Sequence, residues 1–424
     1  MMKKNYFQLG RFWLILAIQI ILFSFTYAQD PGKQDLLVAP LPELLRSESG
    51  LSIGSATQWE DIRRSELLEL FREHVYGRVP LSDLSIVHRL VFEDREALHG
   101  KAIQKEVVLE VCKGADTLKI SVLIFLPKNQ DHAVPLFLGL NFYGNQSIHP
   151  DPQISITDSW VMKNDEFGIV DHRATEASRG VRYHRWPVEL ILSRGYGLAT
   201  ICIGDIDPDF DDGFRNGIQG LLDPEVSERG PDSWGSIAAW AWGLSRAMDY
   251  FETDVEIDQH RVAVMGHSRL GKTSLWAGAQ DERFAMVISN NSGCGGAALS
   301  RRPFGERVSN INTSFPHWFA ARFHDYNNNE VALPVDQHML MALVAPRPLY
   351  VASALEDKWA DPHGEYISLY HGSSAYRLYD KEISLSPQIP PLNQPLNSGS
   401  MGYHNRSGKH DVTRYDWEQY LDFA

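Results

Sequence analysis

The sequence contains little cysteine. Only three of its 424 residues are cysteines, namely Cys112, Cys202 and Cys294. They are too few and too widely spaced for a disulfide framework or a metal cluster, and their odd number leaves at least one thiol free. We interpret Cys294, in the run Ser-Gly-Cys-Gly-Gly, as a small buried thiol rather than as a nucleophile.

Long hydrophobic runs are also scarce. One such run covers residues 12–25. It comes after Met-Met-Lys-Lys at the N-terminus and is followed by Thr-Tyr-Ala. A basic start, an apolar stretch too short to span a bilayer and small residues at its end are typical of a secretory signal peptide. We therefore predict cleavage after Ala28, export to the periplasm or the cell exterior, and no membrane contact afterwards. A retained N-terminal anchor is the alternative.

Basic residues are fewer than acidic ones. The chain has 40 Lys and Arg against 54 Asp and Glu, a net charge of −14, which becomes −17 once residues 1–28, with three basic residues and no acidic one, are removed. So acidic a surface argues against nucleic acid as a partner. No pair of histidines has the spacing of a metal site, so we expect neither metal nor cofactor. We also expect a monomer.

Strand-like and helix-like segments alternate along the chain. Apolar runs predict strands over residues 85–92, 102–111, 118–126, 136–144, 196–204, 262–267, 284–289 and 347–353. Helical spacing predicts helices over residues 62–76, 188–193, 233–250 and 269–278, and a last one from 416. This order predicts a three-layer α/β sandwich around a doubly wound, mostly parallel sheet with antiparallel N-terminal strands.

We divide the chain into three parts. Residues 1–28 form the signal peptide, and residues 29–60, rich in Pro and Ser, form an N-terminal arm. No repeat or linker divides the remainder, so residues 61–424 are expected to form a single catalytic domain with large insertions.

A possible nucleophile lies in residues 262–276, Val-Ala-Val-Met-Gly-His-Ser-Arg-Leu-Gly-Lys-Thr-Ser-Leu-Trp. An apolar strand passes through small residues around Ser268 into a helix, which predicts a turn that exposes the serine hydroxyl beside the first N–H groups of the helix. The usual motif is G-x-S-x-G, but here the second glycine is delayed to Gly271. A simple Gly-Ser turn that closes a buried strand is the alternative.

Two further groups complete a candidate triad. Glu356 and Asp357 follow a predicted strand, and His404 and His410 lie close to the C-terminus, in what we expect to be a single loop. The chain order serine, acid, histidine is that of α/β-hydrolases. A histidine can take the serine proton, and a carboxylate fixes the tautomer of that histidine.

Three segments together resemble a known family. They are Gly-His-Ser-Arg-Leu-Gly-Lys over residues 266–272, Asn-Asn-Ser-Gly-Cys-Gly-Gly over 290–296 and Asp-Lys-Trp-Ala-Asp-Pro over 357–362. They resemble the bacterial glucuronoyl esterases, carbohydrate esterase family fifteen. The resemblance implies a secreted, metal-free α/β-hydrolase that cleaves the ester between 4-O-methyl-glucuronic acid of glucuronoxylan and a lignin alcohol.

The resemblance also assigns roles to residues. Ser268 would be the nucleophile and Arg269 an oxyanion donor, while Lys272 would contact the hydroxyls of the uronate sugar and Trp359 would line the sugar site. Many members carry the triad acid where this chain has Asn291. We therefore assign the acid to Asp357 in preference to Glu356.

For the base, we favour His410 over His404, because the preceding Ser-Gly-Lys can lift the side chain over the edge of the sheet. His267, His317, His338 and His404 are then expected to be structural. Fungal members have a cysteine where this chain has His267, so their disulfide at that place is absent.

Each assignment has a simpler alternative. Arg269 could be a solvated side chain, Lys272 a surface lysine and Trp359 a core residue. The acidic run 205–212 resembles a calcium loop but lacks its full spacing, so we expect a solvated loop there. Rival functions are another carbohydrate esterase, such as an acetyl xylan esterase, and an inactive glycan-binding protein of the same fold.

Overall fold

A ten-stranded sheet forms the centre of the computed structural model, which describes residues 39–128, 130–222 and 229–424. The predicted signal peptide, residues 1–28, lies outside the described residues. The strands are β1 (Ser85–Glu96), β2 (Ala102–Lys113), β3 (Asp116–Pro127), β4 (Val134–Asn141), β5 (Gly197–Cys202), β6 (Ile257–His267), β7 (Met286–Asn290), β8 (Leu349–Ala354), β9 (Leu396–Ser398) and β10 (Met401–Arg406). Their order in the sheet is β1-β2-β3-β5-β4-β6-β7-β8-β10-β9.

The strand directions confirm the predicted fold. Strands β5, β4, β6, β7, β8 and β10 are mutually parallel, whereas β1, β2 and β3 form an antiparallel entry and β9 an antiparallel edge. Strands β4, β5, β7 and β8 are buried along their whole length, which is why they appear in the sequence as largely apolar runs. Their carboxyl ends carry the side chains considered below.

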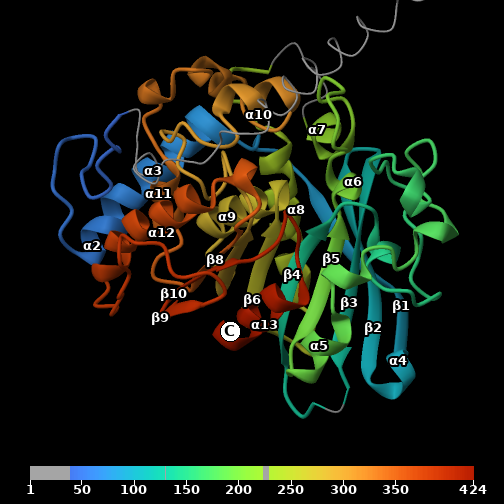
Figure 1. The fold of residues 1–424 in the computed structure, drawn as a ribbon. Helices are drawn as coiled ribbons and strands as arrows, with labels where there is room; N and C mark the ends of the chain where they lie inside the picture. The colour runs from blue at the N-terminus through green and yellow to red at the C-terminus, as the bar shows by residue number, and fades with distance from the viewer. Residues whose placement is uncertain (1–38, 129, 223–228) are drawn as a thin grey trace, which may run out of the picture. The chain divides into compact units, whose positions relative to one another are not determined.

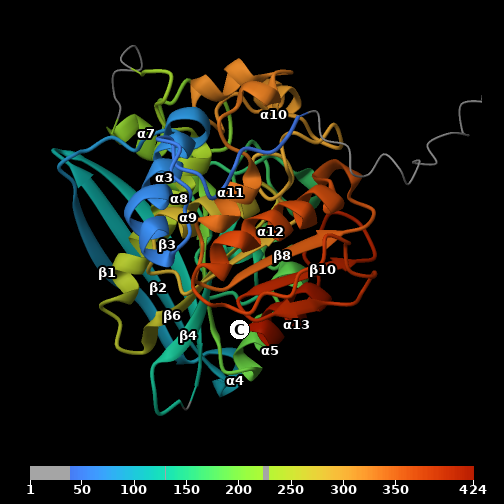
Figure 2. The same ribbon diagram turned by 90° about the vertical axis from the view of Figure 1, so that its left-hand side faces the viewer.

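Helices cover both faces of the sheet (Figures 1 and 2). The helices are α2 (Ala56–Gln58), α3 (Arg64–Phe71), α4 (Ala97–Gly100), α5 (Val188–Ser193), α6 (Ile203–Ile206), α7 (Gly217–Leu222), α8 (Ser236–Phe251), α9 (Arg269–Gln280), α10 (Val308–Ser314), α11 (Gln337–Ala342), α12 (Pro362–Arg377) and α13 (Arg414–Phe423). Helices α8, α9, α11 and α12 share one hydrophobic core with the sheet, and α5 and α13 share a second. The molecule is thus a three-layer sandwich.

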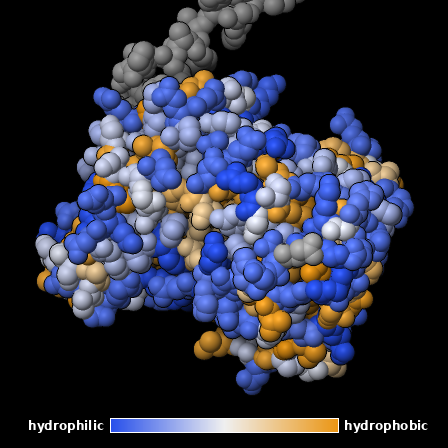
Figure 3. Space-filling view, turned by 90° about the horizontal axis from the view of Figure 1, so that it is seen from below, coloured by the Kyte–Doolittle hydropathy of each residue, from blue (hydrophilic) through white to orange (hydrophobic). Residues whose placement is uncertain are grey.

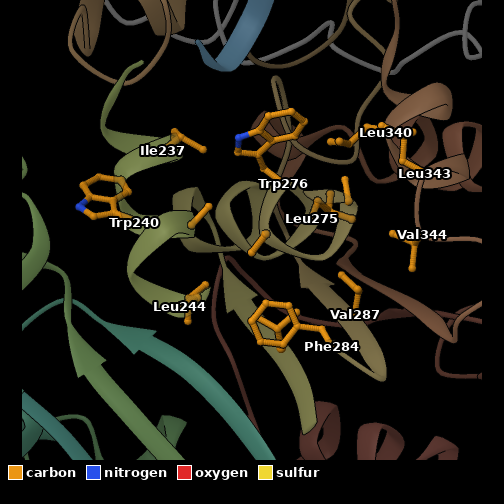
Figure 4. Close-up of a cluster of buried hydrophobic side chains, with 14 of the residues drawn as sticks. Ile237, Trp240, Leu244, Leu275, Trp276, Phe284, Val287, Leu340, Leu343 and Val344 are labelled. Atoms are coloured by element: carbon orange, nitrogen blue, oxygen red, sulfur yellow. The ribbon is translucent and has the colours of Figure 1, made fainter. Parts of the chain in front are cut away.

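Helix α9 is largely buried and directly follows Ser268. Its Leu275 and Trp276 are fully buried and lie between Trp240 of α8 and Leu340 of α11 (Figure 4). Burying side chains of this size contributes roughly 1.5–3 kcal/mol each. The first turn of α9, which follows Ser268, is therefore held firmly against the sheet.

Several elements differ from the sequence prediction. The helix expected from residue 62 begins at Ala56, where Ser55 accepts a hydrogen bond from the Gln58 N–H, and it continues through two π-helical turns to Tyr76. The prediction of one loop holding both C-terminal histidines is wrong, because His404 lies on β10. That strand was missed because its buried side chains include His404, Asn405 and Arg406, of which the first and the last pair with Asp416 inside the protein.

Figure 3 shows the face of the described residues seen from below. Its exposed residues are mainly hydrophilic, and the hydrophobic ones lie in several small groups. Within residues 39–128, 130–222 and 229–424, no helix has the length and hydrophobicity to cross a membrane.

Candidate active site

Ser268 sits on a sharp turn between β6 and α9. Its backbone has φ 62° and ψ −128°, a region that non-glycine residues rarely occupy. The turn requires Gly266, because a Cβ there would lie 1.8 Å from the carbonyl oxygen of Leu270. Ser268 is partly exposed, whereas the strand before it is buried. This geometry is that of the predicted nucleophile turn, although the second glycine of the motif is displaced.

The displaced glycine has a packing role of its own. A Cβ on Gly271 would lie 2.9 Å from the Cβ of Ser292, so a larger residue there would push α9 away from the loop after β7. Leu270, at the usual glycine position, is instead buried in the core. The imperfect motif therefore still brings helix and sheet together closely.

Asp357 and His410 form a short hydrogen-bonded pair. Asp357 follows β8, His410 follows β10, and Nδ1 of the histidine lies 2.5 Å from Oδ2 of the carboxylate. Burial raises the pKa of Asp357, but the hydrogen bond and the charge of His410 outweigh it, and the pKa is lowered. The His410 ring is 4.4 Å from the ring of His267, the residue before Ser268. The pair thus adjoins the nucleophile turn.

The rival acid and the rival base lie elsewhere. Glu356 is exposed, in a turn that directly precedes the buried Asp357. His404 is fully buried, with Nε2 2.8 Å from Oδ1 of Asp416 and Nδ1 3.0 Å from the hydroxyl of Tyr350. Both ring nitrogens of His404 make hydrogen bonds inside the core, which is the environment of a structural histidine.

Arg269 is held by a buried carboxylate. Its Nη1 bonds to Asp209, which also accepts hydrogen bonds from Nε1 of Trp318 at 2.8 Å and from Nε2 of His317 at 3.1 Å. The guanidinium lies 4.4 Å from the ring centre of Trp318. Burial raises the pKa of Asp209, but the charge of Arg269 and these hydrogen bonds outweigh that effect, so the pKa is lowered. Arg269 is therefore a fixed cation rather than a freely solvated side chain.

This contact corrects the expectation of a solvated loop over residues 205–212. Asp205, Asp207 and Asp209 are all buried. Asp205 accepts hydrogen bonds from the Ser121 N–H at 3.0 Å and the Thr157 hydroxyl at 3.1 Å, while Asp209 holds Arg269. The position of the run, directly after β5 at the carboxyl edge of the sheet, was the signal that could have identified it.

Lys272 lies one turn after Ser268, and its neighbours are polar. The side chain is only 4% exposed, so the surface alternative is wrong. Its ammonium donates to the carbonyl of Ser292 at 2.5 Å and lies 3.5 Å from Glu306. Glu306 in turn accepts a hydrogen bond from Nε1 of Trp359 at 3.2 Å. Trp359 is 57% exposed, so it is not a core residue.

Sequence reasoning left Glu306 unassigned, because its segment is too divergent from the family to transfer. Its backbone N–H donates to the carbonyl of Trp359 at 2.8 Å, which ties the two segments together. A cation, a carboxylate and an exposed indole thus meet on the β7 side of Ser268. Such a set can bind a hydroxylated ring by hydrogen bonds and stacking.

Two further residues considered in the sequence, Cys294 and His267, are buried. Cys294 is buried, and burial raises the pKa of its thiol, as expected for a packing residue. His267 is also buried, and burial holds its pKa well below the ordinary value, so its ring is neutral. In the part of the chain that the structure describes, no cluster of three or more His, Cys, Asp or Glu side chains could hold a metal ion.

The sheet, the strand-to-helix turn and the acid–histidine pair beside it define the α/β-hydrolase class. Residues 229–380 match a family model described as glucuronyl esterase, fungi. The chain is 52% identical over 388 residues to the carbohydrate esterase MZ0003 from an unknown prokaryotic organism, a match that covers 91% of this chain and 88% of that protein.

Two further relatives have names that point to the same family. The structure of a glucuronoyl esterase from Solibacter usitatus is 44% identical, with a TM-score of 0.85 over 91% of this chain and 97% of the other. A 4-O-methyl-glucuronoyl methylesterase from Neurospora crassa is 36% identical over 352 residues, which cover 81% of this chain and 73% of the relative. The chain therefore belongs to carbohydrate esterase family fifteen, the glucuronoyl esterases, as its motifs predict.

Proposed function

We propose that the protein hydrolyses the ester between 4-O-methyl-glucuronic acid of glucuronoxylan and a lignin alcohol, through an acyl-enzyme on Ser268. Family membership supports ester hydrolysis. The observation that carries the choice of substrate is the buried Lys272, which lies one turn from the nucleophile. Its ammonium is 3.5 Å from Glu306, which accepts a hydrogen bond from the exposed Trp359. An acetyl group is too small to use these three side chains, whereas a uronate ring has hydroxyls for each polar group.

In the proposed reaction, His410 Nε2 takes the proton of the Ser268 hydroxyl as Oγ bonds to the ester carbonyl carbon. His410 then returns this proton to the alcohol oxygen as the bond between carbon and that oxygen breaks. Water hydrolyses the acyl-enzyme by the same transfers in reverse order. Asp357, 2.5 Å from Nδ1 of His410, holds the required tautomer and stabilises the imidazolium.

The negative charge on the carbonyl oxygen would be stabilised by Arg269 and by the first N–H groups of α9. The ion pair with Asp209 limits the movement of the Arg269 side chain, so little reorganisation is needed when charge develops. Asp209, His317 and Trp318 would act through Arg269 and are not themselves catalytic.

The proposal extends to the whole chain. We infer that residues 1–28 direct export to the periplasm or the cell exterior, and that residues 61–424 form one catalytic domain that works as a monomer. Leu44 and Ile53, from the predicted N-terminal arm, are buried in the main core, which supports an arm packed on that domain.

The direct test compares substrates. Purified protein is incubated with a benzyl ester of glucuronic acid and, separately, with acetylated xylan, and released acid is measured. The proposal predicts efficient hydrolysis of the glucuronate ester and much slower release of acetate. The reverse preference would make the protein an acetyl xylan esterase, and inactivity on both would favour a glycan-binding protein.

A further inference from the structure

Asn291 contacts the carboxylate of the proposed triad directly. It follows β7, and its Nδ2 donates a hydrogen bond of 2.9 Å to Oδ2 of Asp357. The same oxygen accepts the hydrogen bond from His410, at 2.5 Å. Asn291 is 2% exposed, so this amide competes little with water for the carboxylate.

The loop that carries Asn291 is held in place without its side chain. The Asn291 N–H donates to the carbonyl of Ala352 at 2.7 Å. The next two N–H groups, of Ser292 and Gly293, donate to the buried carboxylate of Glu365 at 2.7 and 3.0 Å. Among the described residues, the side-chain oxygen of Asn291 is buried without a hydrogen-bond partner. The amide therefore makes one side-chain hydrogen bond, and that bond goes to Asp357.

We propose that Asn291 is a positioning residue that orients Oδ2 of Asp357 toward His410 and keeps this carboxylate ionised. The inference rests on the proposed function. A neutral donor stabilises a carboxylate beside it, whereas a second carboxylate at 2.9 Å would compete for one shared proton. An acid at position 291 would therefore compete with Asp357 for His410 or for a shared proton, which gives the amide of this chain a functional reason.

The titratable groups around Asp357 decide how a change at position 291 would appear. His410 approaches from the loop after β10, and Glu365 approaches from α12. A negative charge at position 291 would either stabilise the imidazolium of His410 or place a proton on Asp357. Both outcomes remove the active state at low pH, so both move the acidic limb of the activity profile to higher pH.

The experiment uses two variants chosen for the backbone. Asn291 has φ 47°, which glycine and aspartate tolerate better than alanine. Asn291→Gly removes the donor without strain and should lower kcat about tenfold with KM unchanged. Asn291→Asp should shift the acidic limb of the kcat/KM profile upward by about one pH unit or more. The matched control is Asn328→Asp, an exposed residue with φ 55°, which should shift nothing.

The unchanged enzyme is measured in parallel on the same glucuronate ester. If it is inactive, the proposed function fails. If it is active and both Asn291 variants, shown to be folded by their circular dichroism, keep its pH profile and kcat, the positioning role is overturned. A shift for Asn291→Asp alone, without a shift for Asn328→Asp, supports it.

Discussion

Asp357 is the residue on which the proposed triad depends most. An amide there would stabilise the wrong tautomer of His410, so we predict that Asp357→Asn lowers kcat by about two to four orders of magnitude with folding intact. Glu356→Gln, which changes the exposed neighbour, should have little effect. Adding Asn291→Glu to Asp357→Asn should restore part of the activity. Initial rates on a benzyl glucuronate ester measure all three, and a fully active Asp357→Asn enzyme would show that another group is the acid.

The two C-terminal histidines predict opposite phenotypes. His410→Ala removes the proposed base, so kcat should fall by several orders of magnitude while the melting temperature changes little, since that side chain is 42% exposed. His404→Ala removes the hydrogen-bond partner of the buried Tyr350 hydroxyl and one of the partners of the buried Asp416, so it should lower the melting temperature first. Thermal melts and rates on both variants distinguish the roles, and a stable, inactive His404→Ala enzyme beside an active His410→Ala enzyme would reverse the assignment.

We propose that Lys272 contacts the sugar and takes no part in the bond changes. Lys272→Ala should lose most activity on glucuronate esters and little on p-nitrophenyl acetate, because only the former places hydroxyls near the ammonium group. Comparing kcat/KM for the two substrates checks this. Equal losses on both would mean that Lys272 acts only by holding the Ser292 carbonyl, to which it donates at 2.5 Å.

The sequence predicted the residues of the site unevenly. Ser268 and Asp357 follow predicted strands and His410 lies in the predicted last loop, so strand placement and chain order together indicated a common edge of the sheet. Asp209 was missed because a run of five aspartates resembles a solvated loop. Its burial depends on partners 60 and 109 residues away, Arg269 and Trp318, which no local pattern reveals.

At the scale of elements, α12 supports the loop of the triad acid. Its Glu365 accepts hydrogen bonds from two N–H groups after Asn291 and from the hydroxyl of Ser353, and burial raises its pKa to about 8. The folded protein therefore binds this proton more tightly than the unfolded chain, whose pKa is near 4.5. The contribution to stability is full below about pH 4.5 and is lost as the pH rises through about 8.

This linkage predicts a measurable change. Glu365→Gln keeps the shape without the ionisation, so its melting temperature should fall less between pH 5 and pH 8 than that of the unchanged protein. Glu356→Gln is the exposed control and should leave the pH dependence unaltered. Parallel pH curves for the unchanged protein and Glu365→Gln would show that Glu365 does not titrate in this way.

The elements themselves differed in how well they could be predicted. The central parallel strands were found because apolar side chains fill both faces of a covered sheet. The bounds of helix α5 were also predicted correctly. Strand β10 and helix α12 were not. Both carry polar side chains that are buried only because distant residues satisfy them, such as Asp416 for His404 and Ser353 for Glu365.

At the scale of the whole molecule, the sheet brings two different surfaces to one nucleophile. The turn after β6 lies between β4 and β7. Arg269 connects it to Asp209, which follows β5, while Lys272 connects it to Ser292 and Glu306 on the β7 side. The proposed charge stabilisation and the proposed sugar binding would therefore use separate segments, which could vary independently around a constant triad.

The most direct test of the account is covalent labelling of the nucleophile. The protein is treated with a fluorophosphonate, with and without a saturating glucuronate ester, and the modified peptide is identified by mass spectrometry. The account predicts one label, on Ser268, formed more slowly when the ester is present. Absence of labelling, or a label on another residue that the ester does not slow, would contradict it.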